Sequence, residues 1–211
     1  MDSRTLFLDT NVYLGYALDD RFEYFHPECC IIFRSARARH TSDTVRNELR
    51  TKESDRTKLY SDFVKHIESG NPPEQFNCQG LKESDQNHVA RIVELFTKKR
   101  LSLEYFRLLG TELKEGILNG LGKTNKPYVK QSGDDQMKSH FKQAVGIHPP
   151  DNTILTDFFD WAFPRSGSIF ITGDGEIHKK KAPILKHVSI YKGNCTHLDV
   201  QFVTEAASKL R

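Results

Sequence analysis

The sequence predicts an α/β protein whose parallel sheet is flanked by helices. Short apolar runs lie near both ends of the chain, at residues 5–9 and 168–172, and each leads into an acidic residue. Strands of a parallel sheet are buried on both faces and therefore read as continuous apolar runs. Helical patterns separate these runs, which is the order expected when helices connect parallel strands.

Strands and helices are expected to alternate before residue 51. Pro27 suits the first turn of a helix, because its missing N–H would have no partner there. Ser42 or Asp43 suits an N-cap, because a short oxygen-bearing side chain accepts a backbone N–H at that position. The expected order is strand, helix, helix, strand and helix, over residues 5–9, 11–18, 28–36, 39–41 and 43–49.

The stretch from residue 52 to residue 146 is expected to be helical. Apolar side chains recur in it at i, i+3, i+4 and i+7, which is typical of amphipathic helices. Ser84, Ser102 and Asp134 precede three such stripes, and glycines follow the last two. The pattern predicts a helical insertion, 52–146, packed on an α/β core made of residues 1–51 and 147–211.

The alternation returns after residue 147. Asp151 follows two prolines and opens a helix on which it shares a face with apolar side chains, so its carboxyl group is expected to point toward the sheet. Four further elements are expected: a strand, a basic helix start, a second strand, and either a strand or the start of the last helix. They cover residues 168–172, 179–186, 188–191 and 198–203.

The composition is that of a polar globular protein. The 211 residues are 37% hydrophobic and 28% charged, and the mean hydropathy is −0.58. No stretch approaches the roughly 18 apolar residues that a membrane span needs, and the first residues lack a signal-peptide pattern. The four cysteines form no C-x-x-C pair and are expected to be free thiols. We therefore expect a cytoplasmic protein with no membrane partner.

Four acidic residues lie where strands end or helices begin, namely Asp9, Glu48, Asp151 and Asp174. Open α/β sheets bind their ligands at the carboxyl ends of parallel strands, so these side chains are expected to meet there. Gathered carboxylates repel one another unless a cation lies between them. Mg²⁺ and Mn²⁺ prefer carboxylate oxygens, so the pattern predicts a divalent-metal site.

Each acid taken alone has an ordinary structural alternative. Asp151 could stabilise a helix N-terminus, Glu48 could be a solvated helix acid, and Asp174 could belong to a tight turn. Asp9 is hardest to explain in this way, because no turn glycine accompanies it. Asp157 is the alternative third acid if the helix register differs.

Together these segments resemble the PIN-domain nucleases, the fold of VapC-type toxins and of many RNA-processing endonucleases. The motifs that carry the resemblance are Leu6–Asn11, Thr41–Leu49, Asp151–Leu155 with Trp161-Ala162, and Ile169–Asp174. The resemblance implies that Asp9, Glu48, Asp151 and Asp174 hold Mg²⁺ or Mn²⁺ and hydrolyse phosphodiester bonds. It also implies supporting roles for Asn11, Thr172 and Glu176. The long helical insertion departs from the simplest family members and weakens a toxin role more than nuclease chemistry.

The expected partner is nucleic acid, with RNA favoured over DNA by the resemblance alone. The net charge of +3 and a pI near 8.6 are mild, but basic residues lie close in sequence to the acids. The candidate phosphate-binding residues are Arg46, Arg50, Lys179 and Lys180. The helical insertion is expected to contact substrate, a second copy of the chain or an inhibitory protein, and the sequence leaves these three open.

Two other functions remain open at this point. A HAD-type phosphatase also places a nucleophilic aspartate after its first strand, but its second aspartate, two residues later, is Asn11 here. That function would also leave Glu48 and Asp151 without a role. A catalytically silent nucleic-acid-binding or protein-interaction module is the other alternative, and the presence of all four acids argues against it.

Overall fold

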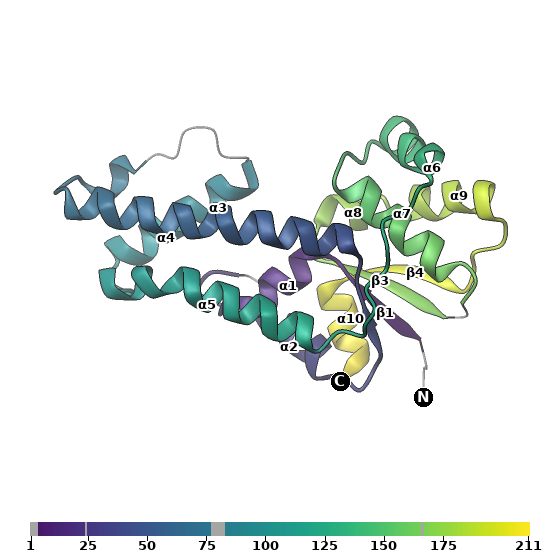
Figure 1. Ribbon diagram of the computed structural model, residues 1–211, viewed down its shortest axis with the longest axis horizontal. Coiled ribbons are helices and arrows are strands. Elements are labelled where there is room, and N and C mark those ends of the chain that lie inside the picture. Colours follow the sequence, from purple (N-terminus) through teal and green to yellow (C-terminus); the bar gives the residue numbers. More distant parts are fainter. Residues whose placement is uncertain (1–3, 24, 77–82, 166) are drawn as a thin grey trace.

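Four parallel strands form the centre of the computed structural model, which describes residues 4–23, 25–76, 83–165 and 167–211 (Figure 1). The strand order is β2-β1-β3-β4, and all neighbours are parallel. The strands are β1 Thr5–Leu8, β2 Arg39–His40, β3 Ser168–Thr172 and β4 Leu198–Phe202. The expected α/β class, a parallel sheet flanked by helices, is confirmed.

Helices occupy both faces of this sheet and the long central part of the chain (Figure 1). They are α1 Thr10–Ala17, α2 His26–Arg34, α3 Asp43–Glu68, α4 Glu83–Thr97, α5 Leu103–Gly122, α6 Asp135–His140, α7 Asp151–Ala162, α8 Gly175–Lys179, α9 Lys181–Lys192 and α10 Val203–Leu210. A 3₁₀ turn, Pro73–Gln75, and a π-helical turn, Phe141–Val145, complete the list. Ser42, Ser102 and Asp134 cap α3, α5 and α6 as predicted.

Aromatic side chains join the sheet to α7. The ring of Phe158 lies 5.5 Å from that of Phe7 and 5.4 Å from that of Phe170, and all three side chains are fully buried. Large apolar side chains of this kind stabilise a core through the area they remove from water. The helices α1 and α10 also contact β3, and Figure 1 shows α10 on the side of the sheet opposite α7.

The helical part forms an arm that is continuous with the core. In Figure 1, α3 and α5 run side by side away from the sheet, and they pack against each other. Helix α5 also packs on α1, where a Cβ added at Gly116 would lie 2.5 Å from the carbonyl oxygen of Ala17. Only glycine allows that approach. The expected boundary between residues 51 and 52 falls inside α3, so one helix connects core and arm.

The structure decides two expectations for the C-terminal part of the chain. The strand expected over 188–191 is wrong, because these residues belong to α9. Ile184 and Val188 are its buried residues, which is helical spacing, whereas Ile190 is 65% exposed and does not continue an inward-facing strand pattern. Residues 198–203 contain both alternatives, since β4 ends at Phe202 and α10 begins at Val203.

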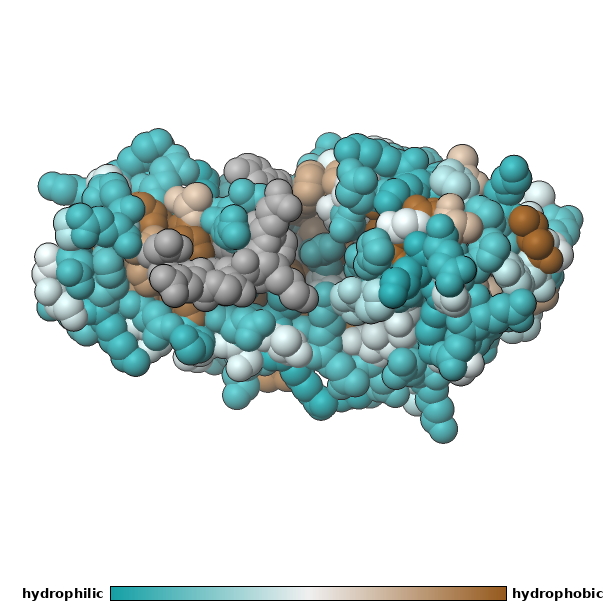
Figure 2. Space-filling view, turned by 90° about the horizontal axis from the view of Figure 1, so that it is seen from above, coloured by the Kyte–Doolittle hydropathy of each residue, from teal (hydrophilic) through white to brown (hydrophobic). Residues whose placement is uncertain are grey.

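The outer surface is mostly hydrophilic, as Figure 2 shows for one face. Within the described ranges, no helix combines the length and apolar character needed to cross a membrane. Cys29, Cys30 and Cys195 are free thiols, as expected, and Cys78 lies outside the described residues.

Candidate functional site

Two of the predicted acids follow the neighbouring strands at which the order of the strands along the chain reverses. The chain passes from β1 to β2 on one side and returns to β3 on the other, so β1 and β3 are neighbours at a topological switch point. In open α/β sheets this point opens the crevice that binds ligands. Asp9 directly follows β1, and Asp174 follows β3 by two residues.

Asp9 is held in place by hydrogen bonds to both carboxylate oxygens. The backbone N–H of Thr10 donates to Oδ1 at 2.7 Å, because Asp9 is the N-cap of α1. The hydroxyl of Thr172, the last residue of β3, donates to Oδ2 at 2.7 Å. Asp9 is only 1% exposed, so these two donors fix a buried carboxyl group.

Glu48 reaches the same place from α3. The hydroxyl of Thr10 donates to Oε2 of Glu48 at 2.5 Å, while the amide of Thr10 holds Asp9. Thr10 is itself buried. One threonine therefore ties together two acids that are 39 positions apart in the sequence.

The surroundings raise the pKa of Asp9 well above its usual value. Burial is the largest cause, followed by the negative charges of Asp151 and Glu48. The hydrogen bonds from Thr172 and Thr10 act in the opposite direction. Asp151 begins α7 and is half-buried, and its negative charge acts on Asp9. Three of the four predicted acids thus interact electrostatically at one point.

Asp174 joins this group through Thr172. The backbone N–H of Asp174 donates to the hydroxyl oxygen of Thr172 at 2.9 Å, and that hydroxyl donates to Asp9. The Asp174 carboxylate caps α8, where its Oδ1 accepts the amides of Glu176 and Ile177 at 2.6 and 3.1 Å. The turn that was the structural alternative for Asp174 is therefore present, and the backbone of Asp174 is linked to Asp9 through the Thr172 hydroxyl.

The four acids offer the donor type that Mg²⁺ and Mn²⁺ prefer, and the buried Asp9 has two like charges beside it. Among the described residues, no three His, Cys, Asp or Glu side chains are grouped closely enough to hold a metal ion by themselves. Threonine hydroxyls donate to one oxygen of Glu48 and to one oxygen of Asp9. Mg²⁺ takes only one or two protein carboxylates and keeps several waters, so this donor set fits a largely hydrated divalent ion.

Some of the other predicted site residues lie at the site, and others have partners elsewhere. Thr172 and Asn11 lie at the site, since a Cβ on Gly173 would come within 3.1 Å of Cβ of Asn11. Glu176 is exposed and pairs with Lys179 at 2.8 Å, beside Asp174. Lys180 donates to the carbonyl of Gly146 at 2.9 Å instead of facing the acids.

The arginines of α3 lie away from the acids. Residues two positions apart on a helix project about 200° apart, so Arg46 and Arg50 extend from the side of α3 opposite Glu48. Arg46 pairs with Asp43 at 3.0 Å and stacks on the ring of Tyr128 at 4.3 Å. The structure therefore does not bring these two predicted phosphate-binding residues together with the acids.

Thr10 belongs to the site although it was not predicted, and Asp157, the alternative third acid, makes a different contact. Thr10 follows Asp9 directly, and its hydroxyl could have been noticed as a partner for a neighbouring acid. Asp157, the alternative third acid, is buried and accepts the backbone N–H of Ser132 at 2.7 Å. It holds the segment before α6 rather than joining Asp9.

No family model, curated protein or solved structure matches this chain. What the site can do therefore follows from its own side chains. These are a buried acid with a raised pKa, two further carboxylates in electrostatic range, a fourth acid linked by a hydroxyl, and a position at the switch point of a parallel sheet. A buried acid with a perturbed pKa and charged partners beside it is typical of functional sites.

Proposed function

We propose that this protein is a metal-dependent endonuclease that hydrolyses phosphodiester bonds, with RNA as the favoured substrate and a PIN-like fold. The observation that carries the proposal is the burial of Asp9 beside Glu48 and Asp151 at the switch point between β1 and β3. Two like charges destabilise a buried acid that has only a structural role. Several carboxylates close together do, however, stabilise a cation that binds among them. The four predicted acids come from four separate segments of the chain. Thr10 and Thr172 connect Asp9 to Glu48 and to the backbone of Asp174, and the charge of Asp151 acts on Asp9.

Asp9, Glu48, Asp151 and Asp174 would hold Mg²⁺ or Mn²⁺, some directly and some through water. When bound, such an ion would supply Lewis-acid chemistry, acidifying water and stabilising the charge that develops on the phosphate. The residues of this chain do the positioning. Thr10 orients Asp9 and Glu48, and Thr172 orients Asp9 and the backbone of Asp174.

The choice of RNA rests on the resemblance of the four motifs to PIN-domain nucleases. Among the predicted basic residues, Lys179 lies at the end of α8, the helix that Asp174 caps, where it pairs with Glu176 and also interacts with the charge of Asp174. The absence of an acid two residues after Asp9 disfavours the phosphatase alternative, because Asn11 cannot act as a general acid.

The direct test is cleavage of labelled RNA and DNA by the purified protein. We expect RNA cleavage with Mg²⁺ or Mn²⁺ and none with EDTA. The Glu48→Gln variant should lose most of the activity, whereas Asp55→Asn, an exposed acid two turns later on α3, should keep it. Cleavage that persists in EDTA, or equal activity in both variants, would contradict the proposal.

Thr172→Val tests the positioning of Asp9 separately. Valine keeps the shape of threonine but loses the hydroxyl that donates to Asp9, so the pKa of Asp9 should rise further. We expect about a 10- to 100-fold loss of cleavage, the usual cost of removing a group that orients a metal ligand. The acid limb of the pH–rate profile should move to higher pH, and Thr172→Ser should restore it.

A matched control is Thr156→Val on α7. Thr156 is also fully buried, but its hydroxyl donates to the carbonyl of Asn152 at 2.7 Å. This variant should leave the pH–rate profile unchanged. An unshifted profile in Thr172→Val would show that Thr172 does not orient Asp9.

A further inference from the structure

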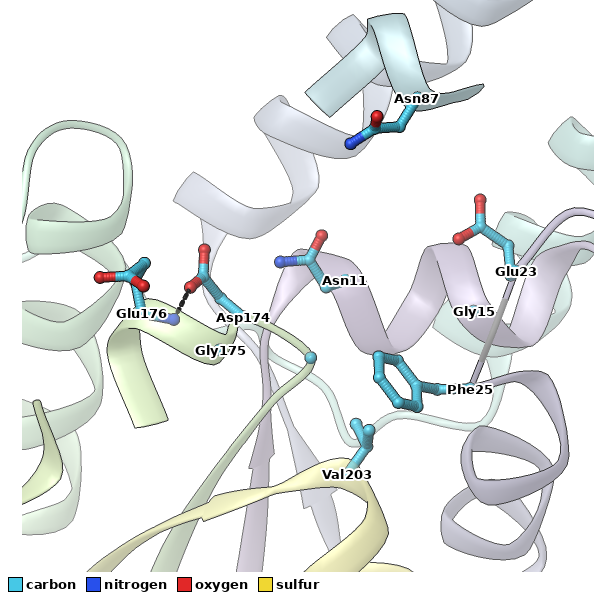
Figure 3. A pocket seen from close by; sticks show the side chains of 10 residues that line it. Asn11, Gly15, Glu23, Phe25, Asn87, Asp174, Gly175, Glu176 and Val203 are labelled. Atoms are coloured by element: carbon cyan, nitrogen blue, oxygen red, sulfur yellow. Dashed lines mark hydrogen bonds between the residues drawn. The ribbon is translucent and has the colours of Figure 1, made fainter. Parts of the chain in front are cut away.

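A pocket of about 480 Å³ opens next to the acids (Figure 3). It lies between α1, the loop after β3, α10 and the first turns of α4, so the core and the helical arm both contribute to it. Its described lining residues are Asn11, Gly15, Glu23, Phe25, Asn87, Gly173, Asp174, Gly175, Glu176 and Val203. The volume falls in the range of small-molecule sites, about 300–1,000 Å³.

The carboxylates of this pocket already have partners. Glu23 pairs with Arg56 at 2.5 Å, and Glu176 pairs with Lys179 at 2.8 Å. Asp174 accepts two backbone amides. Glu23 and Glu176 are therefore neutralised by side chains of the protein, and Asp174 remains a candidate metal ligand at the edge of the pocket.

Its unused polar groups are two carboxamides. Asn11 and Asn87 are exposed, and neither side-chain carboxamide makes a hydrogen bond with any residue that the structure describes. Figure 3 shows Asn11 beside Asp174 and Asn87 extending from α4 on the other side of the same space. Each carboxamide offers both donors and an acceptor.

The position of Asn87 is set by its neighbour. His88 is buried on α4, and its Nε2 lies 2.8 Å from the hydroxyl of Tyr60 on α3. Burial holds the pKa of His88 well below its usual value, so the ring is neutral. This contact anchors the first part of α4 to α3, and Asn87, one residue earlier on α4, lines the pocket.

An aromatic ring forms the apolar side of the pocket. Phe25 lies between Val203 and Asn11 in Figure 3 and is half-buried. Its ring meets that of Phe202 edge to face, with centroids 5.0 Å apart and planes at 86°. That packing holds the ring of Phe25 in place on one side, while Phe25 also lines the pocket.

We propose that this pocket binds one unpaired nucleobase of the nucleic acid, next to the phosphate that the acids cleave. A base is flat, presents a π-face that stacks on aromatic rings, and carries donors and acceptors on its edge that pair with carboxamides. Phe25 supplies the first contact, and Asn11 and Asn87 supply the second. Asn87 is the specificity-determining residue contributed by the arm.

The proposal rests on the proposed function for the identity of the ligand as nucleic acid. It also gives the helical insertion a role in substrate recognition. A base inside a duplex is already paired and stacked, so binding in this pocket requires an unpaired base. The protein should therefore prefer a single-stranded segment over the stem of a hairpin.

The test is binding of a short single-stranded RNA that contains 2-aminopurine, followed by fluorescence in EDTA so that no cleavage occurs. Stacking on Phe25 should quench the fluorescence. Asn87→Ala should weaken binding about tenfold, and Phe25→Leu, which keeps an apolar side chain, about tenfold as well. Asn119→Ala, an exposed carboxamide on α5, is the matched control and should bind normally.

Equal affinity of Asn87→Ala and wild type would overturn the proposal, and so would equal binding of the same sequence within a hairpin stem. Asn87 is exposed, so its variant is expected to fold, and the melting temperature of each variant checks this. Binding that depends on Asn87 without metal-dependent cleavage would support the pocket and contradict the nuclease. Metal-dependent cleavage, together with normal RNA binding by both Asn87→Ala and Phe25→Leu, would support the nuclease and contradict the pocket.

Discussion

Asp9→Asn is expected to abolish cleavage and, at the same time, to make the folded protein more stable at neutral pH. The negative charges of Asp151 and Glu48 both raise the pKa of Asp9, which is buried at the end of β1. Losing about 4 kcal/mol of metal-assisted stabilisation in the transition state, a typical size for such sites, corresponds to about a 10³-fold lower rate.

The gain in stability follows from the charge that the substitution removes. Asparagine keeps the shape of the side chain and has no charge to bury beside Asp151 and Glu48. Its oxygen can accept the N–H of Thr10, and its NH₂ can donate to the hydroxyl of Thr172, which is able to reverse its role. We expect a gain of about 1 kcal/mol, or about 2–4 °C in Tm for a chain of this size.

The pH dependence of stability tests the same point in the absence of metal. The folded-state pKa of Asp9 lies above its usual value of 3.8, so the folded protein binds a proton more tightly than the unfolded chain. The resulting stabilisation is fully present below the unfolded pKa and is lost as the pH rises through the folded pKa. Urea unfolding at several pH values should show this loss in wild type and a flatter profile in Asp9→Asn.

Asp157→Asn is the matched control. Asp157 is also buried and its pKa is also raised, mainly by burial, but it interacts with Ser132 rather than with the acid cluster. Its replacement should alter the pH dependence of stability and leave cleavage intact. If Asp9→Asn retained cleavage, or if both variants lost it equally, Asp9 would not be the centre of the site.

Mn²⁺ or Mg²⁺ is expected to raise the melting temperature of wild type but not that of Asp9→Asn. The ion binds the assembled carboxylates of the folded protein, whereas the unfolded chain does not hold them together. At an ion concentration 100 times Kd the stabilisation is about 2.7 kcal/mol. For a chain of this size that amounts to about 5–10 °C.

NaCl at matched ionic strength controls for general screening of surface charge. Chelation by EDTA should return the melting temperature to its starting value. An equal shift in wild type and Asp9→Asn, or an equal shift with NaCl, would show that the ion does not bind at Asp9.

Local features of the sequence predicted the elements well where one interaction dominated. Strand β3 begins and ends as expected, because its five residues are all buried and read as one apolar run. Ser102 caps α5, because a hydroxyl oxygen satisfies an amide that the helix leaves free. The error at residues 188–191 arose where a four-residue window is too short to separate a strand from a helix.

By itself the sequence determined the kinds of element, most of their order and the positions of the acidic residues at strand ends and helix starts. Only the tertiary structure decided that Thr10 and Thr172 connect Asp9 to Glu48 and to the backbone of Asp174, and that Arg46 and Arg50 extend away from Glu48. It also decided that Asn87 faces Asn11 across a pocket. Periodicity and capping act over a few residues and leave a readable pattern, whereas contacts between distant segments depend on strand order and helix packing, which no local pattern records.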